Sequence, residues 1–211
     1  MKSDITYGTH NSLTYAKLVW WQRPFAWLIN SFCRCQDKDY KEQWRRNITV
    51  FDFQIAKYRG KWKASHGIAW YDAGDIIKIL DWLNSHAQVA GEYLYIAIGI
   101  DERLFQFSKT REKLYNELMK DVSIFQNLFP SLIFYKVYNE SQEYNPRQIY
   151  FFERYWSLAW AKEKIKKEKG LLRWLLMLPI PRLWSFFYRI EWEEQRNDRN
   201  FKSFITDFTV L

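Results

Sequence analysis

The chain has 211 residues, a mass of 26.0 kDa and a formal net charge of +8. Its hydrophobic share of 48% and aromatic share of 20% exclude an intrinsically disordered protein. The length suits one domain, residues 1–211, built around a single core. The excess of basic residues favours anionic partners such as phosphates, acidic lipid surfaces or nucleic acid, and does not choose among them.

Strand-type residues gather in four stretches of the first half of the chain. These predicted strands are residues 4–9, 47–56, 61–67 and 92–100. The last is a continuous apolar run, which is typical of a strand buried on both faces of a sheet.

Two amphipathic helices follow from apolar spacing and from capping residues. For residues 71–88 we expect Asp72 as the N-cap and Asp75 in the first turn, and for residues 108–125 we expect Ser108 as the N-cap. One face of each helix is apolar: Ile76, Leu80 and Leu83 in the first, and Leu114, Leu118 and Val122 in the second. Each helix therefore has one face to bury.

Three further strands are predicted at residues 131–138, 148–153 and 202–211. Alternating strands and helices indicate a parallel α/β fold, and the absence of G-x-G-x-x-G after the first strand disfavours a dinucleotide-binding sheet. The predicted fold is therefore a TIM-type (β/α) barrel. Because 211 residues are few for such a barrel and the eighth strand is not obvious, we expect it to be distorted or trimmed in its C-terminal half.

The two cysteines stand in the sequence C-R-C at positions 33 and 35. They are too close to pair with each other in ordinary disulfide geometry and too few for a zinc site, so free thiols are expected. The start MKSDITYGTH lacks the features of a signal peptide, and the apolar stretch 171–190 is broken by arginines and prolines. We therefore expect a cytoplasmic or peripheral membrane protein.

The candidate catalytic residues lie at or near the ends of predicted strands. His10 ends the first strand, Asp52 lies in the second, His66 ends the third and Asp207 lies in the last. In a βα barrel the carboxyl ends of the strands meet at one mouth, and closure makes the last strand a neighbour of the first. Asp207 would then orient His10 as a base, while His66 protonates a leaving oxygen.

Three motifs resemble those of the phosphatidylinositol-specific phospholipase C X-domain-like phosphodiesterases, whose members are distorted TIM barrels. They are GTHNSLTY, CQDKDYKEQWRRNITVFDFQI and GKWKASHGIAWY, and their order and spacing both agree with the family. The resemblance covers residues 5 to 100, with weaker support from ITDF near the end.

The resemblance implies cleavage of an inositol-type phosphodiester through a cyclic inositol phosphate. His10 would be the general base on the inositol 2-hydroxyl, and His66 the general acid for the glycerol-type oxygen. Asp207 would orient His10, and Asp52 would lie near the phosphate and His66. The expected substrate contacts are Asn11, Gln54, Lys63 and Trp70.

The sequence departs from the family's pattern at the second strand, where Gln54 replaces the arginine of F-D-x-R. Losing this cation removes stabilisation of the phosphoryl transition state. Two substitutes are considered. A basic residue such as Lys57, Arg59, Lys61 or Lys63 reaches inward, or Ca²⁺ binds at Asn11, Asp52 and Asp101, as in the calcium-dependent branch with its His-Asn pair.

Aromatic residues beside basic ones predict a peripheral membrane surface between the first two strands. The expected contacts are Trp20, Trp21, Phe25 and Trp27. The competing interpretation of this segment is ordinary helix packing. No nucleic-acid module is visible, so the expected partners are an anionic phosphodiester substrate and a lipid surface, with no specific nucleic acid.

Two alternatives to the active phospholipase C-like enzyme stay open. One is a catalytically weak or inactive barrel that binds an anionic headgroup or a protein partner, which the absence of the arginine favours. The other is a glycerophosphodiesterase-like barrel, which normally has a Glu-x-Asp metal pair where this chain reads Val50-Phe51-Asp52.

Overall fold

The computed structural model of the chain describes residues 6–9, 11–101, 108–139, 153–155, 169–170 and 203–206. The strands within this part are β1 (Thr6–Thr9), β2 (Ile48–Tyr58), β3 (Lys61–His66), β4 (Ala69–Tyr71), β5 (Leu94–Ile100), β6 (Leu132–Asn139), β7 (Glu153–Tyr155) and β8 (Ser203–Thr206). The helices are the 3-10 helix η1 (Trp20–Phe25) and the α-helices α1 (Ala26–Cys33), α2 (Tyr40–Arg45), α3 (Ile76–Ala90) and α4 (Ser108–Leu128).

The strands form one mixed sheet in which six strands run parallel, in the order β6-β5-β2-β1-β8-β7. The β3–β4 hairpin joins this sheet through antiparallel pairing of β3 with β2. As predicted, the last strand lies beside the first, since Thr6–Thr9 pairs in parallel with Ser203–Thr206. Within the described residues β6 and β7 do not pair, so the sheet is open there and the expectation of a closed barrel is corrected to partial barrel character.

Strands β1 and β3 occupy the same edge of β2 and run toward each other. Thr9 of β1 pairs with Phe51, while Ala64 of β3 pairs with Ile55, and β5 takes the opposite edge of β2 over this whole stretch. The carboxyl ends of β1 and β3 therefore meet beside residues 52–54 of β2. This arrangement brings the segment after β1 close to His66.

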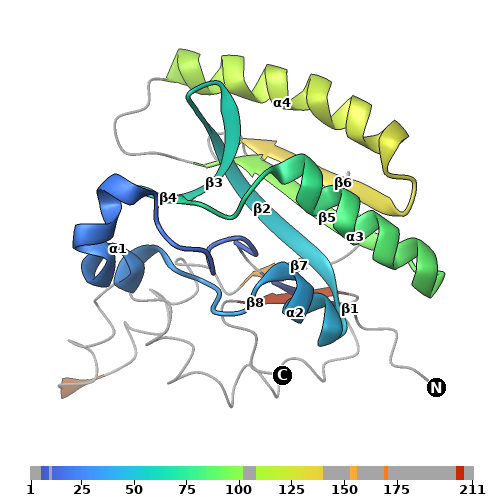
Figure 1. Cartoon of the computed structure of the whole chain (residues 1–211), viewed down its shortest axis with the longest axis horizontal. Coiled ribbons are helices and arrows are strands. Elements are labelled where there is room, and N and C mark those ends of the chain that lie inside the picture. Colours follow the sequence, from blue (N-terminus) through green and yellow to red (C-terminus); the bar gives the residue numbers. More distant parts are fainter. Residues whose placement is uncertain are drawn as a thin grey trace.

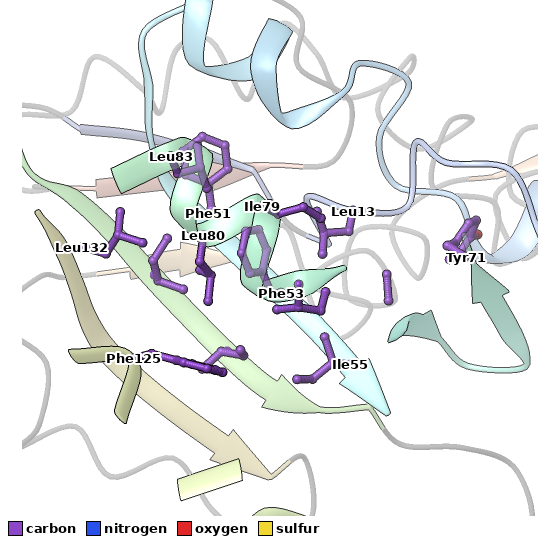
Figure 2. Close-up of a cluster of buried hydrophobic side chains, with 14 of the residues drawn as sticks. Leu13, Phe51, Phe53, Ile55, Tyr71, Ile79, Leu80, Leu83, Phe125 and Leu132 are labelled. Carbon is purple, nitrogen blue, oxygen red and sulfur yellow. The ribbon is translucent and has the colours of Figure 1, made fainter. Parts of the chain in front are cut away.

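The core lies on one face of this sheet, where apolar residues alternate along β2 with polar ones. Phe51, Phe53 and Ile55 pack with apolar residues of α3 and α4, and both helices contact β5 and β6 (Figure 1). Figure 2 shows Phe51 and Phe53 within this cluster, beside Leu80 of α3. Because side chains alternate across a strand, Asp52 and Gln54 point to the other face.

The start of α3 differs from the sequence prediction. The helix begins at Ile76, and its N-cap is Asp75, whose carboxylate accepts the Ile77 N–H at 2.9 Å. Asp72, the predicted cap, instead forms an ion pair with Lys63 at 2.7 Å. The prediction of Asp72 as the N-cap was wrong. The partner of Asp72 is Lys63 on β3, and the spacing of residues along the helix does not reveal a partner on another strand.

This correction predicts different effects for two similar substitutions. Asp75→Ala removes the cap and is expected to lower the free energy of unfolding by about 1 kcal/mol. Asp72→Ala breaks only an exposed ion pair and is expected to cost about 0.5 kcal/mol or less. Urea unfolding of both variants checks the assignment. A larger loss for Asp72→Ala than for Asp75→Ala would contradict it.

Candidate functional site

Two of the predicted catalytic residues, His10 and Asp207, lie outside the described residues. In the sequence His10 follows Thr9 and Asp207 follows Thr206, and these two threonines are paired between β1 and β8. The described part of the site is therefore built from the residues after His10, from β2, from the end of β3 and from the segment after α1.

The chain turns sharply after β1 at Asn11. This residue has φ 48°, in the left-handed region that asparagine tolerates better than most residues. The turn is closed by Thr14, whose N–H and hydroxyl donate to the Asn11 carbonyl at 3.0 and 2.9 Å. Asn11 is buried, and its backbone N–H donates to Asp52 Oδ2 at 3.4 Å. The predicted neighbours Asn11 and Asp52 are therefore brought together.

Backbone and hydroxyl groups hold Asp52 against the same turn. The Ser12 N–H donates to the Asp52 carbonyl at 2.8 Å, and the Asp52 N–H donates to Ser12 Oγ at 3.0 Å. These bonds continue the contact between the two segments past the end of β1. The Asp52 side chain is 1% exposed, so its carboxylate is held in place within the protein interior.

His66 ends β3 and is partly exposed. Its Nδ1 lies 2.7 Å from the carbonyl oxygen of Cys33, the last residue of α1. Because a carbonyl only accepts hydrogen bonds, Nδ1 carries a proton in both the neutral and the charged ring. Nε2 is therefore the nitrogen available for proton transfer, as a general acid at this position requires.

A thiol links His66 to the Asn11 turn. Cys35 Sγ lies 3.6 Å from His66 Nδ1, and the Asn11 side-chain amide donates to the same sulfur at 3.6 Å. Both cysteines are free and buried, which confirms the prediction of free thiols. Their place in the site was not predicted, because the bonding partners of Cys35 lie far away in the sequence and no spacing pattern connects them.

The turn after His66 is a two-residue hairpin loop that is held by Asp101. Gly67 adopts φ 58°, which a hairpin of this length requires at its first loop position, and its N–H donates to Asp101 Oδ1 at 3.1 Å. The Asp101 N–H donates to the carbonyl of Ile55 at 3.0 Å. Asp101 therefore anchors the loop that carries His66.

The three candidate calcium ligands do not form one group. The register pairs Asp52 with Ala97, four residues before Asp101, so the two backbones are separated by about 13 Å along the sheet. Within the described part of the chain no cluster of three or more His, Cys, Asp or Glu side chains could hold a metal ion.

Two buried oxygen atoms on the polar side of the site have no partner among the described residues. They are Gln54 Oε1 and Ser65 Oγ, on residues that are 7% and 1% exposed. Gln54 is paired with Gly99 on β5. A buried polar atom without a partner costs free energy, so these two oxygens are candidates for contact with a polar group of a ligand.

The basic residues considered as substitutes for the missing arginine have other partners or exposed positions. Lys57 pairs with Glu117 of α4 and lies over the Trp62 ring, and Lys63 pairs with Asp72. Arg59 and Lys61 are exposed at the β2–β3 turn. Trp70, also predicted as a substrate contact, packs against Tyr58 with a ring separation of 5.3 Å.

Tyr71 adds a neutral phenol to the neighbourhood of the two thiols. Burial is the main cause that raises the pKa of Tyr71, and the nearby Cys33 and Cys35 side chains raise it further. The Tyr71 hydroxyl is buried and has no partner among the described residues. The phenol therefore stays protonated at physiological pH.

The predicted membrane contacts all lie on η1 and α1, at the edge of the molecule (Figure 1), and all are exposed. Trp20 and Trp27 are 70% and 75% exposed, and Trp21 and Phe25 are 43% and 61% exposed. We refer to these four residues as the aromatic patch. None of the helices among the described residues is long and apolar enough to cross a bilayer.

Comparison with solved structures places this fold beside bacterial phosphatidylinositol-specific phospholipases C. The Staphylococcus aureus enzyme matches with a TM-score of 0.60 at 12% identity, over 99% of this chain and 87% of its own. The Listeria monocytogenes enzyme matches with a TM-score of 0.53 at 11% identity, over 98% of this chain and 89% of its own. No protein-family model matches the sequence, and no curated protein is significantly similar to it. At these identities the likeness establishes a shared fold.

Proposed function

We propose that this chain is a phosphodiesterase of the phosphatidylinositol-specific phospholipase C type, which cleaves an inositol-type phosphodiester at a lipid surface. The observation that carries the proposal is the meeting of β1 and β3 along one edge of β2. In this arrangement the turn that follows His10 contacts Asp52. The Cys35 sulfur lies within hydrogen-bond distance of both this turn and His66. The shared fold with bacterial enzymes of this type supports the same reaction class.

In the proposed reaction His10 takes the proton of the inositol 2-hydroxyl, and that oxygen attacks the phosphorus atom. The bond from phosphorus to the glycerol oxygen breaks, and His66 donates the Nε2 proton of its charged form to the leaving oxygen. The products are a cyclic inositol phosphate and a diacylglycerol-type alcohol. Asp207 orients His10 by accepting its second N–H, and Asp52 holds the Asn11 turn beside the phosphate.

Phosphorus NMR of vesicles tests the reaction directly. Purified protein is incubated with phosphatidylinositol vesicles, once with calcium and once with a chelator, and the spectrum is followed for a cyclic inositol phosphate. We expect the cyclic product in both conditions, because Asp52 and Asp101 lie too far apart to share one ion. Product only with calcium would contradict the metal-independent mechanism, and no product in either condition would contradict the proposed activity.

The aromatic patch is proposed to contact the membrane. Tryptophan favours the bilayer interface, and the patch is exposed where no described side chain covers it. We expect Trp20→Ala and Trp27→Ala each to weaken vesicle binding by about 10- to 100-fold, because each removes about 1.5–3 kcal/mol of apolar burial. Tyr93→Ala is the matched control, since Tyr93 is 61% exposed and precedes β5, away from the patch. Equal losses in all three variants in a vesicle sedimentation assay would contradict the assignment.

A second candidate function is a barrel that binds an anionic headgroup without cutting it. The observation that favours it is Gln54, since Lys57 and Lys63 are committed to ion pairs and do not replace the missing arginine. Gln54→Arg distinguishes the two functions. If the chain is an enzyme limited by this cation, the variant is expected to raise turnover about tenfold or more. Tighter vesicle binding with no turnover in either protein would favour the binding function.

A further inference from the structure

The segment between α1 and α2 bonds to both halves of the candidate site. Arg34 donates from its guanidinium to the carbonyls of Thr14, Tyr15 and Ala16. The backbone N–H groups of Cys35 and Gln36 both donate to Thr14 Oγ1, at 2.9 and 3.1 Å. These bonds fix residues 34–36 against the Asn11 turn without using the Cys35 thiol.

The Cys35 thiol makes a separate set of contacts. Its sulfur accepts the Asn11 side-chain amide and lies within hydrogen-bond distance of His66 Nδ1, and the thiol donates to the Cys33 carbonyl at 3.9 Å. That carbonyl is the acceptor for the His66 Nδ1 proton at 2.7 Å. The Cys35 side chain thus contacts the His66 ring nitrogen, the carbonyl that accepts its proton and the Asn11 amide.

We propose that Cys35 is a positioning residue for His66. This inference rests on the proposed function. The sulfur joins the imidazole to the Asn11 turn, so that the residue expected to donate a proton keeps a fixed place relative to the segment that follows His10. A carboxylate or a backbone carbonyl often accepts this N–H; here the Cys33 carbonyl accepts it, and the Cys35 thiol lies beside it.

Turnover and proton exchange together test this role. Cys35→Ala is expected to lower kcat about three- to tenfold with little change in KM, as fits the loss of one weak hydrogen bond in the transition state. In a His66→Ala background the same substitution is expected to have no further effect, because the two residues act together. Cys35→Ser is expected to recover part of the activity. An equal loss with and without His66 would overturn the proposal.

A measurement without substrate separates this inference from the proposed function. In nitrogen-15 labelled protein, the His66 Nδ1 proton is expected to exchange with solvent at least fivefold faster in Cys35→Ala than in the unaltered chain. Ile29→Val, which removes one methylene from buried α1 core, is the control and is expected to leave the exchange unchanged. Faster exchange in a chain that proves inactive supports the positioning role and refutes only the reaction. Unchanged exchange overturns the positioning role whatever the activity.

Should Cys35→Ala fail to fold, Asn11→Gly provides the same test from the other side of the sulfur. Glycine accepts the backbone angle of φ 48° at this position, so the turn is kept while the amide donor is lost. Exchange of the His66 Nδ1 proton is again expected to rise. No change in this variant would overturn the proposal.

Discussion

His66→Ala is expected to lower turnover of phosphatidylinositol by about 100- to 10,000-fold, the range contributed by one well-placed proton transfer. The reason is the fixed ring: with Nδ1 bonded to the Cys33 carbonyl, only Nε2 is available to donate to the leaving oxygen. His10→Ala is expected to produce a loss of the same order. The rate of cyclic product formation, followed by phosphorus NMR, measures both effects.

His86→Ala is the matched control for these substitutions. His86 stacks on the Trp82 ring of α3 at a centroid distance of 3.7 Å, and its Nδ1 donates to the Trp82 carbonyl at 2.8 Å. It has no part in the proposed reaction, so its replacement is expected to leave turnover unchanged. Circular dichroism confirms that each variant is folded. Full activity of folded His66→Ala would remove His66 from the mechanism.

Phe53→Ala is expected to produce the largest loss of stability, about 3–5 kcal/mol in the free energy of unfolding. Phe53 is fully buried at the centre of β2, within the core shared by the sheet and α3. Removing its ring leaves a cavity that the paired neighbours β3 and β5 cannot close. Urea denaturation measures the change as a lower midpoint.

Ile77→Ala on α3 is the control for Phe53. The side chain is 50% exposed, so its truncation is expected to cost less than about 1 kcal/mol. Similar midpoints for the two variants would mean that the face of β2 carrying Phe53 is not the core. Because Asp52 and Gln54 flank Phe53 on the other face, a reduced turnover in Phe53→Ala at temperatures where it is folded is also expected.

The sequence was most informative where a pattern lies within a few residues. The apolar runs predicted β2, β3 and β5 to within a few residues at each end, and helical spacing predicted α3 and α4. The neighbouring positions of the first and last strands followed from barrel geometry and are confirmed by the pairing of Thr9 with Thr206. The short strand β4 was not predicted, because three residues are too few for a period to be visible.

Individual residues of the candidate site could be named from the sequence, but the contacts between them could not. The sequence predicts Asn11 and Asp52 at one site, and in the structure the Asn11 N–H contacts the Asp52 carboxylate. Asp101 is one of the possible calcium ligands considered from the sequence, and in the structure it holds the loop after His66. The strand register that separates Asp101 from Asp52 depends on pairing between strands, which residue spacing does not show. Cys35 was missed because its contacts reach 24 and 31 residues along the chain, a distance over which sequence spacing carries no signal.

The pairing of β1 with β8 has a consequence for the order in which the protein forms during synthesis. Thr6–Thr9 leaves the ribosome long before its partner Ser203–Thr206 is made. Contacts between such distant segments form slowly, because a long loop must close first. The β2–β5–β6 part, with α3 and α4, has its contacts within a shorter span and can form earlier. The edge of β1 that pairs with β8 therefore stays open until Ser203–Thr206 has been made, and during that time it is exposed to pairing with other strands.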